Sequence, residues 1–534
     1  MSLISDHRPR FGIAVSADRA GHASLLFASL LLACLGLFGL LLVYAAQTGL
    51  GHWQVDEFRY FADHDRLGLR AYFERFEVSP RPFSELLIYG YGAMVLAFER
   101  SFVSAALLTI WSASLLAMAI AAYATARPVR GRLAAAATLA LAPMLFTLQV
   151  SPVTEMFYWP IATVAYLPMV SAVTILMLLL ADEPRTATRR AWCGVALGVA
   201  VLSHEIGAAV AIGFAIGAVA LNTFRPRTQR EHVRWWLLPA LAGVGVMLGL
   251  LLFRSHYVDL GSNTKPYTGR LIASAIVALR QMLIDVVTTG SWPHDPVGAL
   301  AALLQKTAFA TGFATIWLRF GSVHSSRWHA MLGVGITASV YFSLLGAYYH
   351  YGELCCERQA STRQWLIELA FILAAAAVLL RWPGRRGLLG SRAAPFGPLL
   401  LVASLFPVIA QIPAMRADFE QLSLAGAARF KTWQSGLAPG ARMQFYMPPD
   451  KPDMLIHGTS MPVGTLDLLT LPYDPANVAA AAGRFFRKST VDACQAWQTQ
   501  DSFLINGVFI PACPPHDGPP DRVFNTGPDG KPIF

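Results

Sequence analysis

The chain has few charged residues. Asp, Glu, Lys and Arg make up only 14% of its 534 residues, whereas soluble domains carry about 25%. Hydrophobic residues account for 55%. This balance excludes an ordinary soluble protein. Apolar runs of about 20 residues, the length of a membrane-spanning helix, recur up to about residue 414. The sequence therefore predicts an all-α polytopic membrane bundle.

The sequence also lacks several ligand-binding motifs. It contains no Walker or dinucleotide-binding glycine motif, and no cysteine and histidine spacing that resembles a zinc site. Of the six cysteines, Cys34 and Cys193 lie in predicted spans, where we expect them to be packing residues. Cys494 and Cys513 flank a predicted hairpin, and an oxidising compartment would permit a disulfide between them.

Arginine clusters predict the orientation, because basic connections stay in the cytoplasm. The first apolar run, residues 23–46, is longer than the roughly 7 to 15 residues of a signal-peptide core, so we interpret it as an uncleaved anchor. With residues 1–22 cytoplasmic, about eleven spans place every basic connection inside: 23–46, 102–124, 133–150, 161–181, 191–204, 207–223, 235–253, 298–319, 328–349, 366–381 and 396–414. The net charge of +10 comes mostly from these arginines, and indicates orientation and contact with anionic membrane lipids, not nucleic-acid binding.

The predicted transmembrane domain covers residues 23–414, with a first outer loop at 47–100. Within that loop, 83–98 is apolar but too short to cross comfortably. In the later outer connection 254–296, the stretch 271–287 carries polar residues among aliphatic ones. Both stretches predict interfacial helices.

Residues 415–534 predict a small α/β domain outside the membrane, because Pro, Gly, Asp and Lys become frequent there. We expect helices at 418–433 and 475–488 and a strand at 442–446. A hairpin is expected at 503–510, where Asn506-Gly507 has the composition of a two-residue turn. The tail from residue 514 is predicted to be extended or disordered.

Asp56 and Glu57 are the candidate catalytic residues. They follow the first span, in the loop that the arginine pattern places outside. One carboxylate could act as a general base, and the pair could hold a divalent cation such as Mg²⁺ or Mn²⁺. The alternative is a solvated acidic loop, since exposed carboxylates are common. Neighbouring aromatic residues favour a structured segment at the interface.

Candidate substrate-binding residues occur at the outward ends of other spans. Glu155 at the membrane rim could line a cavity or form an ion pair between two spans. Tyr158 and Trp159 could stack on a sugar or belong to the aromatic belt. His204-Glu205 interrupts an apolar stretch, as a substrate-site support or as a polar helix end.

Basic residues supply the remaining candidates. Lys306 lies inside the span 298–319, where its ammonium would snorkel or face an anionic headgroup. His350, Arg358 and Arg363 lie in and beside an outer connection. A guanidinium can bind the phosphate of a lipid carrier in bidentate fashion, although attraction to lipid headgroups would also account for these residues.

Asp56-Glu57-Phe58 after the first span, followed by interfacial helices, a helical bundle and a terminal outer domain, resembles the GT-C superfamily of membrane glycosyltransferases. The segment 155–159 resembles its bacterial branch. The resemblance implies an inverting transferase that moves a sugar from a polyprenyl-phosphate donor to a glycan, lipid or protein acceptor at the outer face. It implies that Asp56 or Glu57 is the base and that an arginine stabilises the departing phosphate. It also implies a bacterial inner membrane, with the C-terminal domain in the periplasm.

Two other functions compete with a transferase. A transporter, flippase or channel needs charged or broken helices near the midplane, whereas most polar candidates here lie towards one face. A ligase that joins a finished glycan to an acceptor would use the outer-face His and Arg residues instead of the acidic pair.

Overall fold

The computed structural model describes residues 17–50, 55–78, 80–97, 103–150, 154–181, 184, 186–223, 234–257, 271–289, 292, 295–321, 327–351, 354, 357–381, 395–407, 412–413 and 416, and six three-residue strands between 442 and 510. Within the helices, the side chains of 17–23, 55–59, 76–78, 154–155, 221–222, 251, 253–257, 350–351 and 357 fall outside the description, as do those of residues 49–50.

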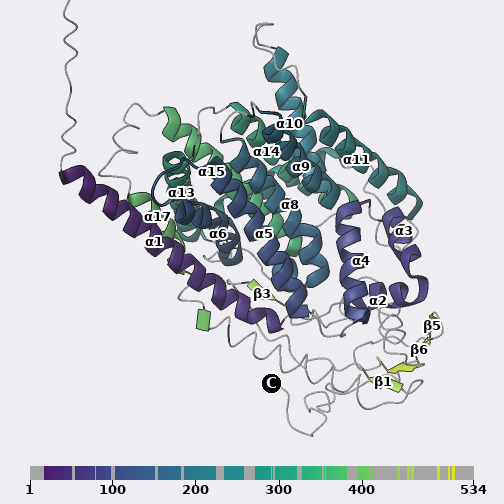
Figure 1. Cartoon of the computed structure of the whole chain (residues 1–534). Helices are drawn as coiled ribbons and strands as arrows, with labels where there is room; N and C mark the ends of the chain where they lie inside the picture. Colours follow the sequence, from purple (N-terminus) through teal and green to yellow (C-terminus); the bar gives the residue numbers. More distant parts are fainter. Residues whose placement is uncertain are drawn as a thin grey trace, which may run out of the picture.

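The described chain forms a helical bundle, with α1 along one edge and α8 near the centre (Figure 1). Each of the eleven predicted spans overlaps a helix: α1 (Ala17–Ala46), α5 (Val103–Thr125), α6 (Arg132–Val150), α8 (Pro160–Leu179), α9 (Ala187–Ser203), α10 (Glu205–Thr223), α11 (Leu237–Tyr257), α13 (Pro296–Phe320), α14 (Arg327–Tyr351), α15 (Glu357–Arg381) and α17 (Phe396–Ser404).

Seven of the described helices, α1, α5, α6, α8, α13, α14 and α15, are long and apolar enough to cross a membrane. Shorter apolar stretches form parts of α10 and α11. The helix α17 covers only nine residues of the predicted span 396–414. The fold is therefore that of a multi-pass helical membrane protein, as predicted from the apolar runs.

Two basic connections meet at one end of the bundle. The backbone N–H of Arg127 donates to the carbonyl of Phe320 at 2.6 Å, and Ala126 pairs with Gly321. Arg132 donates to the last turn of α5, and Arg189 donates to the last residue of α8. Cations are favourable at helix C-termini, where carbonyls have no partner within the helix. We call this the arginine end, and it agrees with the predicted clustering of basic connections on one side.

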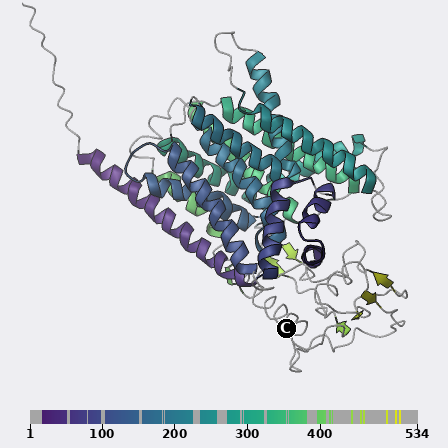
Figure 2. The ribbon, with the colours of Figure 1, turned by 45° about the vertical axis from the view of Figure 1, so that its right-hand side comes forward.

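The opposite end carries η1 (Gln47–Leu50), α2 (Val55–Leu67), α3 (Leu69–Val78), α4 (Pro82–Ala97) and α7 (Thr154–Tyr158). The hydroxyl of Tyr158 donates to the carbonyl of Tyr44 at 3.0 Å, which joins α7 to the end of α1. The hydroxyls of Thr48 and Ser104 are 3.0 Å apart. We call this the loop end, and α2 and α4 lie there in both views (Figures 1 and 2).

Both predicted interfacial stretches are helical, as α4 and as α12 (Leu271–Val287). The helix α4 packs against the bundle, because the hydroxyl of Ser84 lies 2.6 Å from the carbonyl of Ser203 and 3.3 Å from that of Ala165. The helices α2 and α3 pack on α4 in turn. Helix α4 is thus attached to the bundle, and α2 and α3 of the first outer loop are attached through α4.

Six strands follow the bundle: β1 (Arg442–Gln444), β2 (Met454–Ile456), β3 (Thr459–Met461), β4 (Thr490–Asp492), β5 (Phe503–Ile505) and β6 (Val508–Ile510). The sheet order is β1-β4-β6-β5, with β1 and β6 parallel to β4 and with β5 antiparallel to β6. Pairing of Ile505 with Val508 leaves a two-residue loop, which confirms the predicted hairpin. The predicted helices 418–433 and 475–488, Cys494 and Cys513 lie outside the described residues.

Glycines allow α10 and α14 to approach closely. A Cβ added at Gly335 would lie 2.6 Å from the carbonyl oxygen of Val210 and 3.0 Å from the backbone N of Phe214. A Cβ at Gly213 would lie 2.8 Å from the Cα of Gly335. These atoms belong to backbone, which cannot move aside as a flexible side chain can. Small residues at helix interfaces are the usual means of close packing in membranes.

We predict that Gly335→Ala lowers the free energy of unfolding by about 1 to 3 kcal/mol, the usual effect of overpacking. The matched control is Gly333→Ala in the same helix, where the nearest atom to an added Cβ, on Leu373, lies 3.9 Å away. Thermal unfolding of the purified protein in detergent measures both. Equal stability of the two variants would show that α10 and α14 do not pack in this way.

Candidate functional site

The acidic pair Asp56-Glu57 occupies the first turn of α2, at the loop end. Its side chains lie outside the described part of the structure. The helix α2 ends at Leu67, and the following residue, Gly68, has a φ of +56° and donates its N–H to the carbonyl of His64 at 2.9 Å. Glycine adopts this left-handed conformation without steric cost, so it ends α2 and lets the chain turn into α3.

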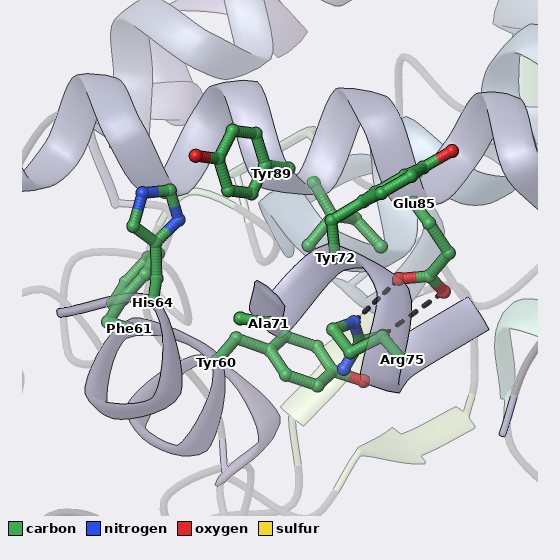
Figure 3. Close-up of a pocket in the computed structure, with 10 residues that line it drawn as sticks. Tyr60, Phe61, His64, Ala71, Tyr72, Arg75, Glu85 and Tyr89 are labelled. Atoms are coloured by element: carbon green, nitrogen blue, oxygen red, sulfur yellow. Dashed lines mark hydrogen bonds and ion pairs between the residues drawn. The ribbon is translucent and has the colours of Figure 1, made fainter. Parts of the chain in front are cut away.

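The helices α2, α3 and α4 enclose a small pocket, which we call the aromatic pocket (Figure 3). Its lining includes aromatic rings from all three helices, one imidazole and an ion pair, from Tyr60, Phe61, His64, Ala71, Tyr72, Arg75, Glu85, Ile88, Tyr89 and Gly92. Among these, Phe61 packs edge-on against Tyr91 in the core of the loop end, with ring centroids 5.5 Å apart. The aromatic pocket therefore lies among packed side chains of the first outer loop, and this packing holds its lining residues in place.

Arg75 and Glu85 form one wall of the aromatic pocket. The Nε and Nη2 atoms of Arg75 donate to the two carboxylate oxygens of Glu85, at 2.6 and 3.1 Å. The guanidinium also lies over the ring of Tyr60, 3.3 Å from its centroid. The Glu85 side chain is only 2% exposed. A buried carboxylate needs such bidentate pairing to offset the loss of hydration.

His64 lies on another wall, stacked on Tyr89 with ring centroids 4.4 Å apart. Burial lowers the pKa of the imidazole below its ordinary value of 6.5, while the Asp65 carboxylate opposes this shift. The ring is therefore mainly neutral at pH 7, with one N–H donor and one acceptor nitrogen. Sequence reasoning passed over His64 and its flanking residues Asp63 and Asp65, although the spacing of acidic residues around a histidine was visible.

A second ion pair joins α4 to the break between α9 and α10. Arg81, just before α4, donates through Nε and Nη2 to both carboxylate oxygens of Glu205, each at 2.7 Å. Burial by itself would lower the pKa of Arg81, but the Glu205 carboxylate holds that pKa above its ordinary value. The guanidinium therefore stays charged. Glu205 of the predicted polar turn thus has a partner 124 residues away, which the sequence did not indicate.

His204 separates α9 from α10 and is fully buried. Its Nδ1 accepts a hydrogen bond from the N–H of Ile206 at 3.2 Å and lies 3.4 Å from a carboxylate oxygen of Glu205. Its ring packs on Tyr166, with centroids 4.3 Å apart. In this arrangement His204 ends one helix and begins the next, which is the helix-end alternative considered above.

The helix α7 contains Glu155, whose side chain falls outside the described residues. Tyr158 is fully buried and bonded to α1, so its ring packs in the core at this point. Trp159 is 3% exposed, and the guanidinium carbon of Arg358 lies 4.9 Å from its ring centroid. The structure therefore brings together Trp159 and Arg358, two residues predicted separately.

Lys306 is fully buried, and its ammonium donates to three carbonyls at the end of α12: those of Asp285, Val286 and Thr288, at 2.6, 3.1 and 2.9 Å. An ammonium has three N–H bonds, and all three have acceptors here. In this conformation Lys306 caps α12 and does not snorkel. Its binding of an anionic headgroup stays a prediction.

Arg363 is buried as well, with its Nε 2.8 Å from a carboxylate oxygen of Asp285. Gln281 donates to the other carboxylate oxygen of Asp285. Arg363 therefore positions α12 against α15. The side chain of His350, the third basic candidate of this connection, lies outside the described residues.

Glu368 is a residue that the sequence reasoning missed. It is fully buried in α15, and its Oε2 lies 2.8 Å from the hydroxyl of Thr147 in α6. A single carboxyl group inside an apolar stretch was the available signal, since such groups are costly in a membrane and need a partner. Among the described residues, no group of three or more His, Cys, Asp or Glu side chains could hold a metal ion.

No protein-family model matches the chain, and no curated protein matches it either. Among solved structures, a crystal structure of ArnT from Cupriavidus metallidurans, bound to undecaprenyl phosphate, aligns over 85% of this chain and 84% of that chain, with a TM-score of 0.38 and 14% identity. Because similarity at this level does not establish a shared fold, the function proposed below depends on the residues of this chain.

We predict that Arg81→Ala lowers the free energy of unfolding by about 2 to 4 kcal/mol, because it leaves a mostly buried carboxylate without its partner. Arg70→Ala is the control, since Arg70 and Glu74 form an ion pair whose side chains are 76% and 45% exposed. We expect the control to lose less than about 0.5 kcal/mol. Denaturant unfolding in detergent measures both, and equal losses would contradict the ion pair of Arg81 with Glu205.

We predict that His64 has a lowered pKa in the folded protein. Because the folded-state pKa is lowered, the associated stability is present above pH 6.5 and is lost as the pH falls below it. In spectra of labelled histidine, assigned with a His64→Gln variant, we expect the His64 signal to titrate below pH 6.5. Asp65→Asn should lower the pKa further, because it removes the opposing charge. A pKa above 6.5 would contradict the burial of His64.

Proposed function

We propose that this chain is a membrane glycosyltransferase of the GT-C type. It takes a sugar from a polyprenyl-phosphate donor and passes it, with inversion, to a glycan, lipid or protein acceptor at the loop end. The proposed location is a bacterial inner membrane, with the loop end and the domain at 415–534 facing the periplasm.

The observation that carries the proposal is the difference between the two ends of the bundle. Arginines of the arginine end cap helix C-termini, as Arg132 and Arg189 do. At the loop end, an acidic helix start, a pocket with aromatic walls and a guanidinium stacked on Trp159 occur together. A carboxylate base and a cation for a phosphate are the two groups that inversion at an anomeric carbon requires.

In the proposed reaction, the Asp56 or Glu57 carboxylate takes the proton of the acceptor hydroxyl. The hydroxyl oxygen then forms the new bond to the anomeric carbon of the donor. The bond between that carbon and the phosphate oxygen breaks, and its electron pair leaves with the phosphate. We assign Arg358 to the departing phosphate, because a planar guanidinium matches its oxygens.

The charged residues inside the bundle favour a transferase over a transporter. A transporter needs polar groups that meet its cargo along a path through the membrane. In the described part of the chain, Lys306 instead binds the carbonyls of α12, and Arg363 binds Asp285. Both residues are thus engaged in holding helices together.

We predict that Glu57→Gln or Asp56→Asn reduces the rate of sugar transfer by about 10²- to 10⁴-fold, the usual contribution of a general base. Glu74→Gln, an exposed carboxylate in α3 of the same loop, is the matched control and should keep the normal rate. Glycan mass analysis of cells expressing each variant measures the transferred sugar. The transferase proposal is wrong if both acidic variants modify the glycan at the normal rate.

The same experiment addresses a ligase. If only Arg358→Ala or His350→Ala abolishes modification, while both acidic variants remain active, a glycan ligase that uses outer-face cations becomes the better description. Loss of a single sugar from the glycan in cells without this gene would instead support a transferase, and would identify the sugar.

A further inference from the structure

The helix α12 carries one basic residue in the middle of an exposed apolar face. Arg280 is the tenth of its 17 residues, and its side chain is exposed. The neighbours of Arg280 one helical turn away are aliphatic and 36% to 64% exposed: Ile276, Val277, Leu283 and Ile284. The buried residues Ser274, Ala278 and Asp285 lie on another face. The helix therefore has one packed face and one face that presents an arginine among aliphatic side chains.

The positive charge of Arg280 is not neutralised within the described part of the chain, where Arg280 makes no hydrogen bond or ion pair. The acidic residue of α12, Asp285, binds Gln281 and Arg363 through its two carboxylate oxygens, each at 2.8 Å. An arginine in the last turn of a helix, such as Arg319, is favourable beside the terminal carbonyls. Arg280 is about two turns from either end of α12, so the helix ends do not account for it.

The helix α12 lies beside a helix that is long and apolar enough to cross the membrane. The hydroxyl of Tyr341 in α14 donates to the carbonyl of Ala275 at 3.5 Å, and Tyr341 lies about 15 Å before the end of α14. Towards the other end of α12, Asp285 binds Arg363 of α15, and the residue before Arg363 contacts α7 at the loop end. Arg280 lies midway between these two contacts. It is therefore at membrane depth, in the half of the bundle nearer the loop end, where an arginine extends its guanidinium towards the lipid headgroups.

The composition of this face favours a lipid over a second copy of the chain. A symmetric contact between two copies of α12 would bring two Arg280 side chains together, and like charges at close range oppose association. A phospholipid matches both characters of the face without a further requirement. Its acyl chains can lie along Ile276 and Leu283, and its phosphate oxygens can accept two hydrogen bonds from one guanidinium.

We propose that α12 binds an anionic phospholipid of the leaflet at the loop end, with Arg280 on the phosphate and the aliphatic side chains beside it on the acyl chains. This inference does not depend on the proposed transferase function, because it uses no residue assigned to the reaction. The bound lipid covers the face of α12 that makes no contact with the bundle.

Native mass spectrometry of the full-length protein with added lipids measures the binding. The probes are dioleoylphosphatidylglycerol, dioleoylglycerol, which has the same chains without phosphate, and glycerol 1-phosphate, which has no chains. We expect Arg280→Gln to weaken binding of phosphatidylglycerol about fivefold, the effect of one basic residue near an anionic lipid surface. Arg280→Lys should retain most of the binding, since it keeps the charge. Arg66→Gln is the matched control, because it removes an exposed arginine from α2 at the same end and should bind normally.

Photo-crosslinking locates the lipid on the protein. A photoreactive phenylalanine analogue that replaces Leu283, which is 57% exposed beside Arg280, should crosslink phosphatidylglycerol in preference to dioleoylglycerol. Adding Arg280→Gln should remove this preference. The same analogue in place of Leu248, which is 54% exposed in an uncharged stretch of α11, should crosslink the two lipids equally.

Equal binding of phosphatidylglycerol by the wild type and Arg280→Gln would overturn the inference, as would the same lipid preference at positions 283 and 248. An equal loss in Arg66→Gln would show an effect of net charge only and would also overturn it. Competition by glycerol 1-phosphate would indicate a site for a soluble phosphate instead. If a polyprenyl phosphate displaces phosphatidylglycerol from position 283, the face binds the lipid donor, and the phospholipid is the wrong occupant. None of these readouts uses sugar transfer, so a failure of the transferase proposal leaves them unchanged.

Discussion

The ion pair between Arg81 and Glu205 determines where the first outer loop lies. Arg81 immediately precedes α4, and Glu205 begins α10 beside the buried His204. The two hydrogen bonds of this bidentate pair, together with the bond of Ser84 to the carbonyl of Ser203, fix the N-terminal end of α4 on the bundle. Because α2 and α3 pack on α4, this attachment determines the positions of the acidic helix start and of the aromatic pocket. A mostly buried pair of this kind adds little net stability, since the loss of hydration offsets much of its Coulomb attraction, and its main effect is to hold α4 in one position.

A single rule about helix ends accounts for the contacts of Lys306 and of the arginines at the arginine end. A backbone carbonyl at a helix end has no partner within the helix, and the membrane interior offers no water to replace one. Lys306 meets this need for α12 with three bonds, Arg132 for α5 and Arg189 for α8. Lys306, Arg132 and Arg189 thus perform the same task of satisfying helix carbonyls. A cationic side chain near a helix end therefore indicates a substrate site only if the carbonyls at that end already have other hydrogen-bond partners.

The parts of the structure that depend on local sequence could be predicted, and the parts that depend on distant partners could not. Apolar runs located the spans, and Asn506-Gly507 located the hairpin, because span length and turn geometry are set by neighbouring residues. Arginine spacing correctly grouped the connections at 127–132 and 319–327. The bonds of Arg81 with Glu205 and of Glu368 with Thr147 join residues 124 and 221 positions apart. One sequence shows that such groups need partners, but it does not show which partners they have.

These pairings reduce the set of residues that can perform chemistry. The side chains of Lys306, Glu205 and Arg363 each bind the chain itself, and Tyr158 is enclosed in the core. A substrate would have to displace these bonds before it could bind there, and would leave a carbonyl or carboxylate without a partner in a poorly hydrated site. Asp56 and Glu57, which we propose as the base, occupy the first turn of α2. Negative charge is favourable at a helix N-terminus, so the carboxylate form that a base requires is stabilised by α2 itself. In the proposed transferase, the acidic pair is therefore ionised at neutral pH, the form that can accept a proton.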